Sequence, residues 1–305
     1  FLLFLFVSCK SDVTTLFGGK ILNKTSDSIS IYKDNIMIHE SRVDSDGVFS
    51  ISLDSINSGL FSFYHEPEFQ YIIIDKNDNL QIRLNTLDFD ESLVYTGKGS
   101  SKNNYLMDVF LRSEEDEIYI NSKLDSDLKD FKFLVDSLYQ RQMYFFIEFT
   151  ENNNLSYTSK EIIKTATLYP YISKFHSYII RNTVDQDGQN SLFFNYQDEI
   201  RYDIDALAYF KPYIDFLYLD LYNYVKNDKE YENSLDFNIQ RLLYTDKIVK
   251  SELIKSRILR FHAVGFLLQR EDDLKNKTFL EAFLDISKNK EVNEEINKLY
   301  KDLME

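Results

Sequence analysis

Cysteine is nearly absent from this sequence of 305 residues, which holds only Cys9. An internal disulfide requires two cysteines, so none can form within these residues. Thiol–disulfide exchange also requires two thiols, one that attacks as a thiolate and one that resolves the mixed disulfide. The residues given therefore cannot carry out dithiol redox chemistry by themselves.

Glycine, proline and tryptophan are scarce too, with 8 Gly, 3 Pro and no Trp. Flexible linkers are built mainly from Gly, Ser and Pro, so the sequence has little material for a long one. Its 44% hydrophobic and 28% charged residues are instead typical of packed globular cores. The length indicates about two domains. The 25 Phe and 22 Tyr must fill much of those cores.

Basic residues are outnumbered, because 35 Lys and Arg against 50 Asp and Glu leave a net charge of −15. A nucleic-acid backbone is bound by clustered Lys and Arg, so we expect no nucleic-acid partner. The same charge disfavours electrostatic attraction to anionic lipid. Attachment to a membrane would therefore have to come from a covalent lipid.

The sequence also lacks the spacing of a metal site. Its four histidines, His39, His65, His176 and His262, are far apart and form no zinc signature. We interpret His39 and His262 as hydrogen-bonded structural residues, and we expect neither a metal nor another cofactor.

One stretch, Asp75-x-Asn77-x-Asn79, begins like a calcium loop. Such a loop needs Gly at its sixth position and Glu at its twelfth, where this chain has Leu80 and Thr86. The stretch is therefore interpreted as a polar hairpin turn.

Three further polar stretches are interpreted as structural. Asp44-Ser45-Asp46-Gly47 fits a turn in which Gly takes a positive φ. Gly97-Lys98-Gly99-Ser100 lacks the spacing of a phosphate loop and is interpreted as a domain junction. The acidic run Glu114–Glu117 points around a helix, so we expect a solvated face rather than a paired acid/base site.

The N-terminus supplies the one hydrophobic run. Seven apolar residues, 1–7, precede Ser8 and Cys9, which is far short of the roughly 20 residues of a membrane-spanning helix. Phe6-Val7-Ser8-Cys9 resembles a bacterial lipobox, with Phe6 in place of the usual Leu. We expect residues 1–9 to be a signal-peptide remnant with Cys9 lipidated, since several acyl chains on one residue anchor stably. The alternative is a buried first strand or an unprocessed hydrophobic terminus.

Residues 13–98 alternate between apolar and polar with a period of two, and turn residues interrupt the pattern. The predicted strands are Leu16–Leu22, Ser28–Tyr32, Ile36–Val43, Val48–Leu53, Leu60–His65, Gln70–Asp75, Leu80–Asn85 and Leu93–Thr96. Short strands separated by turns predict an antiparallel β-sandwich or barrel-like module.

In residues 100–305 the apolar spacing changes to three and four, which predicts an all-helical, multi-helix domain. The predicted helices cover about 100–111, 125–149, 159–181 with an interruption or kink at Pro170, 205–225, 235–248, 251–269, 277–287 and 291–303, and 185–188 is expected to be a loop. The predicted fold class is thus α+β, with the β-module followed by the helical domain.

The aromatic stretch from Tyr209 to Tyr224 could offer stacking rings to a ligand. Its helical spacing indicates mainly core, and a binding face is the alternative. The candidate ligand-binding residues are Tyr209, Tyr213 and Tyr218.

The order of these features resembles a known family. The lipobox is followed by Phe17-Gly18-Gly19-Lys20-Ile21, the turn within 43–49, a hairpin over 71–84 and a closing segment from Tyr95 to Leu106. This order is similar to the N-terminal region of thioredoxin-like (TlpA/ResA-type) disulfide oxidoreductase lipoproteins. The end of the chain, 279–300, is similar to the segment that leads into their thioredoxin domain, but the Cys-x-x-Cys pair is not in this sequence.

The resemblance implies a membrane-anchored, non-catalytic region of an envelope lipoprotein, periplasmic or in the outer membrane. It would anchor, space, dimerise or present substrate to a thioredoxin-like domain or a redox partner protein. Redox activity is expected only if a Cys-x-x-Cys domain follows Glu305. The alternative is a stand-alone lipoprotein that binds a glycan or a peptide.

Overall fold

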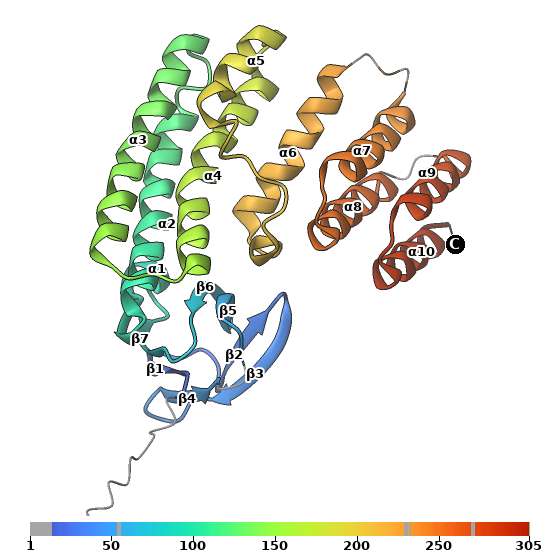
Figure 1. The fold of residues 1–305 in the computed structure, drawn as a ribbon. Helices are drawn as coiled ribbons and strands as arrows, with labels where there is room; N and C mark the ends of the chain where they lie inside the picture. The colour runs from blue at the N-terminus through green and yellow to red at the C-terminus, as the bar shows by residue number, and fades with distance from the viewer. Residues whose placement is uncertain (1–13, 54–55, 229–230, 232, 270–271, 305) are drawn as a thin grey trace, which may run out of the picture. The chain divides into compact units, whose positions relative to one another are not determined.

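The computed structural model describes residues 14–53, 56–228, 231, 233–269 and 272–304 (Figure 1). Two compact units make up this part of the chain. The β-unit holds the described residues up to Asp108 together with Asn153–Lys160, and the helical unit holds Val109–Asn152 and the residues from Glu161 onward. The fold class is α+β, as the sequence predicts.

The β-unit contains two four-stranded sheets. In the first, the strand order is β4 (Val48–Ser52), β1 (Leu16–Leu22), β7 (Asn79–Asn85) and β8 (Val94–Lys98). In the second, it is β3 (Ile36–Arg42), β2 (Ser28–Lys33), β5 (Gly59–His65) and β6 (Glu68–Ile74). All neighbours are antiparallel except β1 and β7, which run parallel.

Alternation along the strands places the core between the two sheets. On β7, Leu80, Ile82 and Leu84 are buried and the residues between them are not. Phe17 of the first sheet packs on Phe63 of the second, with ring centroids 5.5 Å apart. The apolar face of each sheet is therefore buried against the other, as in a β-sandwich.

Two turns, between β3 and β4 and between β6 and β7, carry the chain from the second sheet back to the first. Between β3 and β4, an Asp44 carboxylate oxygen accepts hydrogen bonds from the amides of Asp46 and Val48, at 2.9 and 2.8 Å. Gly47 follows with φ 79°, so the predicted glycine turn is confirmed. The predicted hairpin over 71–84 is wrong, because β6 and β7 lie in different sheets.

Helix α2 (Ser100–Asn121) begins two residues after β8 and bonds to an edge strand of each sheet. Asn103 accepts from the amide of Ile73 in β6 at 2.7 Å and donates to the carbonyl of the same residue at 2.8 Å. Asn104 does the same with Tyr95 in β8, at 2.9 Å for both bonds. Each side-chain amide thus replaces a neighbouring strand and covers a sheet edge.

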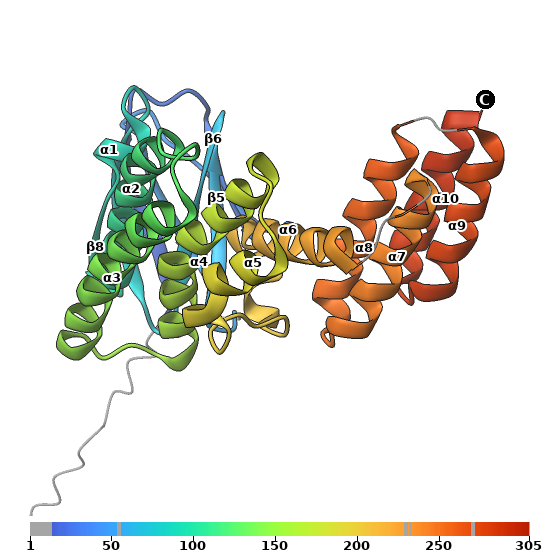
Figure 2. The same ribbon diagram turned by 90° about the horizontal axis from the view of Figure 1, so that it is seen from above.

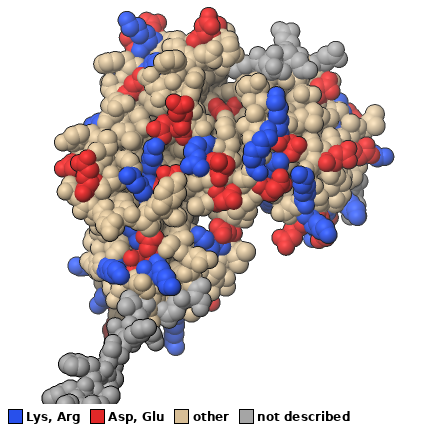
Figure 3. All heavy atoms as spheres, in the orientation of Figure 1, with Lys and Arg blue, Asp and Glu red and all other residues tan. Residues whose placement is uncertain are grey.

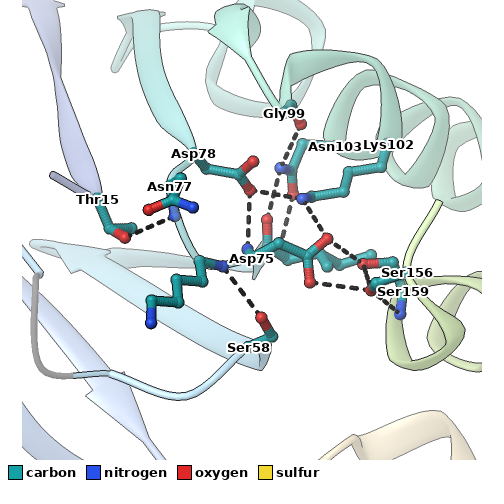
Figure 4. A network of polar contacts seen from close by, with 12 residues as sticks. Thr15, Ser58, Asp75, Asn77, Asp78, Gly99, Lys102, Asn103, Ser156 and Ser159 are labelled. Carbon is teal, nitrogen blue, oxygen red and sulfur yellow. Dashed lines mark hydrogen bonds and ion pairs between the residues drawn. The ribbon is translucent and has the colours of Figure 1, made fainter. Parts of the chain in front are cut away.

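Lys102, next to these asparagines, lies at the centre of a polar network (Figure 4). Its ammonium group is 2.7 Å from a carboxylate oxygen of Asp75 and 2.5 Å from one of Asp78. Asp75 also accepts hydrogen bonds from the hydroxyls of Ser156 and Ser159, at 2.9 and 2.8 Å. The stretch that begins like a calcium loop is thus a turn whose carboxylates are bonded to a lysine.

Opposing effects act on the Asp75 carboxyl. Burial disfavours its charged form, but the bonds from Lys102, Ser159 and Ser156 outweigh burial and hold its pKa below its ordinary value. Gly99 lies against this network with φ 93°, and a Cβ there would come 2.4 Å from the Asp78 carboxyl carbon. The Gly97–Ser100 stretch is therefore a tightly packed β-to-helix junction.

The remaining helices are α1 (Phe89–Ser92) in the β-unit, then α3 (Leu128–Asn152), α4 (Tyr157–Arg181), α5 (Gln186–Phe193), α6 (Lys211–Asp228), α7 (Ser234–Ile248), α8 (Glu252–Leu267), α9 (Asp273–Ile286) and α10 (Lys290–Met304). The division between the units falls within α2 and α4. Helices α7 to α10 pack side by side (Figure 2), with the Phe266 and Phe279 rings stacked 4.2 Å apart.

Three details of the helical unit differ from the predictions. Helix α4 runs through Pro170 without interruption. The predicted loop 185–188 instead starts α5, because an Asp185 carboxylate oxygen caps the helix by accepting from the Gly188 amide at 2.8 Å. The predicted helix 205–225 is a 3₁₀ turn, Asp205–Leu207, followed by α6.

None of the described helices is both long enough and apolar enough to pass through a membrane. Charged side chains of both signs are interspersed on the face drawn in Figure 3.

Candidate functional site

The residues proposed from the sequence are dispersed. Cys9 lies outside the described residues. Tyr213 is fully buried and its hydroxyl donates to the Arg201 carbonyl at 2.7 Å, so its ring offers no surface to a ligand. Tyr209 is half-buried under the Arg257 guanidinium, 3.9 Å from the ring centroid.

Tyr218 is also half-buried and packs on the rings of Phe261 and His262, at 4.5 and 4.8 Å between centroids. Neither Tyr218 nor the other two tyrosines lines the cavity described next. The aromatic stretch is thus mainly core, and the ligand-binding role of these tyrosines stays a prediction.

The helical unit contains a cavity of about 460 Å³, which we call the amide-lined cavity. Its wall is formed by residues of α4, α5, α6 and α7 and of the segment between α5 and α6. They are His176, Ile179, Gln186, Gln189, Asn190, Phe193, Gln197, Tyr202, Asp220, Asn223, Tyr224 and Tyr244. The volume lies in the usual range of small-molecule sites, about 300–1,000 Å³.

The buried floor of the cavity is a histidine between two polar residues of α6. His176 is 1% exposed, and its Nδ1 is 2.8 Å from the Asn223 amide nitrogen. With that amide donating, the histidine proton is on Nε2. Nε2 lies 3.3 Å from an Asp220 carboxylate oxygen. This is ion-pair distance for a protonated histidine, but the two groups are not aligned as a hydrogen bond.

Asp220 is also bonded to Tyr202, whose hydroxyl donates to its second carboxylate oxygen. Burial and then the Asp220 charge raise the pKa of Tyr202, so the phenol stays protonated and remains a donor. One oxygen of Asp220 is therefore engaged by the protein, and the other faces the His176 edge.

Two buried atoms at the floor have no hydrogen-bond partner, His176 Nε2 and Asn223 Oδ1. Asn223 is 4% exposed, so neither atom belongs to an open surface. A buried polar atom without a partner costs about 1–3 kcal/mol, which is why such atoms are rare in folded proteins. Here the unpartnered donor and acceptor belong to two side chains that line the cavity.

The rim of the cavity is rich in carboxamides. Gln186, Gln189 and Asn190 come from α5 and Gln197 from the turn that follows, and Gln186 donates to Asn190 at 3.1 Å. Aromatic rings complete the wall. Phe193 packs 4.8 Å from the His176 ring, and Tyr224 and Tyr244 stack 3.9 Å apart and nearly parallel.

This arrangement is suited to binding rather than to covalent chemistry. Asp220 is the only carboxylate among the described lining residues, which include no Lys, Arg, Ser, Thr or Cys. Among these lining residues His176 thus has no Ser, Thr, Cys or Lys side chain to activate as a nucleophile, and the Tyr202 hydroxyl is bonded to Asp220. Nor does any group of three or more His, Cys, Asp and Glu side chains in the described chain suit a metal ion.

Two of the other histidines, His65 and His262, have structural surroundings. His65 is buried, with Nδ1 2.9 Å from the Ser28 carbonyl and Nε2 accepting from the Thr25 amide at 3.3 Å. His262 is buried 3.4 Å from the Thr245 hydroxyl, and burial, then Arg241, hold its pKa well below the ordinary value. His39, by contrast, is exposed on β3, so the interpretation of this residue as a structural histidine is not supported.

One acidic residue departs from the expected solvated face. Glu114, Glu115 and Glu117 are exposed, but Asp116 is buried. It accepts from Arg141 at 2.6 and 2.7 Å and from the Tyr171 hydroxyl at 2.6 Å. Since Asp116 is fully bonded, it stabilises the packing of α2, α3 and α4 and is no candidate for ligand binding.

A hollow of about 710 Å³ in the β-unit is larger. Two of its lining residues, Leu53 and Ile56, flank positions 54–55, which the structure does not describe. We therefore build the candidate site on the amide-lined cavity.

Sequence reasoning missed the residues at the floor of this cavity. Asp220 and Asn223 lie four and seven residues after buried Phe216, so they continue the apolar stripe of α6 with polar side chains. These polar residues on an otherwise apolar helix face are the sequence signal that could have revealed the site. The position of His176 opposite them depends on how α4 and α6 pack, which no local pattern reveals.

Comparison with protein-family models, with curated proteins and with solved structures finds no match to this chain. Its function must therefore be inferred from its own side chains.

Proposed function

We propose that this chain is the non-catalytic, membrane-anchored part of an envelope lipoprotein related to thioredoxin-like (TlpA/ResA-type) oxidoreductases. The observation that carries the proposal is the order of parts. A two-sheet β-module closes with β8 and continues at once into helices through Gly99 and Lys102. That order supports the resemblance seen in the sequence.

In this proposal Cys9 holds the lipid and the folded units stand on the periplasmic side of a membrane or in the outer membrane. Redox chemistry belongs to a thioredoxin-like domain or a partner protein, because these residues include one cysteine. The β-unit and the helical unit anchor and space that domain, dimerise, or present its substrate.

The test is the intact mass of the native protein from its own cells, before and after thiol labelling. We expect a lipidated species heavier than 36.2 kDa by about one small domain, with two reducible thiols. A species of the mass of these residues plus lipid would exclude the redox part. Replacement of Cys9 by Ser should release the protein from membranes; if it stays bound, the lipid anchor is wrong.

A second candidate function is ligand binding, and the amide-lined cavity favours it. The cavity has the volume of a small-molecule site and holds buried polar atoms without partners. Such a role is compatible with the first proposal, since a substrate-presenting region also needs a binding site.

A further inference from the structure

We propose that the amide-lined cavity binds an uncharged saccharide of one or two sugar units. The inference rests on the second candidate function, ligand binding, and specifies its ligand class. It is carried by three observations: the charge of the wall, the hydrogen-bonding groups left without partners at the floor, and the aromatic rings at the side.

The charge of the wall excludes several ligand classes. Asp220 is its only carboxylate, and no Lys or Arg is among the described lining residues. A phosphate or carboxylate ligand would meet a like charge without a cation to compensate for its desolvation. A purely apolar ligand would leave His176 Nε2 and Asn223 Oδ1 unsatisfied. The wall is thus suited to a neutral, polar molecule.

Hydroxyl groups match the floor because each can donate and accept. His176 Nε2 offers a donor, and Asn223 Oδ1 and an Asp220 oxygen offer acceptors. Two adjacent hydroxyls of a sugar ring can donate to the two oxygens, while a hydroxyl oxygen accepts from Nε2. Asn223 and Asp220 are three residues apart on α6, so their side chains lie on one face of the helix.

The rim extends the same chemistry. Gln186, Asn190 and Gln197 carry carboxamides that suit the remaining hydroxyls of a ring or of a second sugar, whereas Gln189 is bonded to the Val184 carbonyl at 2.9 Å. A sugar ring also has an apolar face of C–H groups. Tyr224 is 51% exposed, and although Tyr244 covers one face of its ring, the other face suits packing on those C–H groups.

A cationic ligand fits the cavity less well. Asp220 already accepts from Tyr202, and the adjacent His176 Nε2 presents a donor that a cation cannot use. An extended peptide needs a groove that accepts several residues, whereas this site is a cavity of about 460 Å³. Choline, as a cation, and trialanine, as a peptide, therefore represent these two ligand classes in the test.

The test is isothermal titration of the full chain with glucose, galactose, N-acetylglucosamine and a disaccharide of each, with choline and trialanine as separate probes. We expect at least one neutral sugar to bind with a dissociation constant of about 1 mM or tighter. Asp220→Asn keeps the shape of the side chain and should weaken that binding about tenfold or more. The matched control is Asp215→Asn, an exposed position on the same helix, which should leave binding unchanged.

Tyr224→Ala provides a second variant at an exposed ring, so the test does not depend on a change at the floor. It should also weaken sugar binding about tenfold. The saccharide proposal is overturned if no sugar binds, if Asp220→Asn and Tyr224→Ala bind as well as Asp215→Asn, or if only choline or trialanine binds. The last result would retain ligand binding as a function, and none of these results bears on lipidation at Cys9.

Discussion

Replacing Asn103 by Ala should destabilise the β-unit more than its small change in volume suggests. Asn103 is 1% exposed and bonds to both the amide and the carbonyl of Ile73, at 2.7 and 2.8 Å. Ile73 is fully buried, so water cannot replace the missing side chain. The alanine variant would leave one donor and one acceptor of the edge strand without partners.

The magnitude follows from the two orphaned groups. Each buried group without a partner costs about 1–3 kcal/mol, which gives about 2–6 kcal/mol for the pair. A domain of this size has a total unfolding free energy of about 5–15 kcal/mol. We therefore expect a large loss of stability in the β-unit, with β6 affected first.

Two measurements check this expectation. Urea unfolding followed by circular dichroism gives the loss of stability, and hydrogen exchange of peptides from β5 and β6 shows whether it is local to the edge. Asn103→Leu fills the volume but also lacks the hydrogen bonds, so it should be destabilised as well. Asn121→Ala, exposed on the same helix, is the control. An unfolding free energy of Asn103→Ala within about 0.5 kcal/mol of Asn121→Ala would refute the reasoning.

Three further predictions follow from single contacts. Lys102→Met leaves the Asp75 and Asp78 carboxylates without their buried cation and should reduce the unfolding free energy by about 3–5 kcal/mol in urea titrations at pH 7; a loss below about 1 kcal/mol would contradict it. Because the folded state depresses the pKa of Asp75, its stabilisation is present above about pH 4 and is lost as the pH falls through the folded value. The stability difference between wild type and Asp75→Asn should therefore shrink below about pH 4, and a difference independent of pH would be the opposing result. Asp185→Ala removes the N-cap of α5 and should lower the unfolding free energy by about 1 kcal/mol, with faster hydrogen exchange at Gly188 and its neighbours. The control is Asp187→Ala, which changes an aspartate of the same first turn that does not cap the helix.

The strands were predictable because one face of each is buried. The alternation of Leu80, Ile82 and Leu84 with polar residues marks β7 directly. Pairing was not predictable, since the period of two does not say which sheet a strand joins. The turn at Asp75–Asp78 thus suggested a hairpin, whereas it connects two sheets whose order depends on long-range contacts.

The helices were predictable because one face of each is buried, and the incorrect predictions concern short segments only. Residues 185–188 carry Gly and two Asp, which indicate a loop, but an Asp at such a position also caps a helix. The bonds of Asn103 and Asn104 to the sheet edges could not be predicted, because an asparagine early in a helix is ordinarily solvated. Only the folded chain brings Ile73 and Tyr95 within reach.

Two buried polar clusters of this protein differ in a way that separates structure from function. At the junction, the carboxylate of Asp75 and the amide groups of Asn103 are all bonded to protein atoms, so nothing is left for a ligand. In the amide-lined cavity, His176 Nε2 and Asn223 Oδ1 have no hydrogen-bond partner although both are buried. Leaving such atoms unpaired costs free energy, since an apolar side chain would fill the same space without the penalty. In the proposal above, a molecule bound in the cavity supplies the missing partners, and the sugar titrations test it.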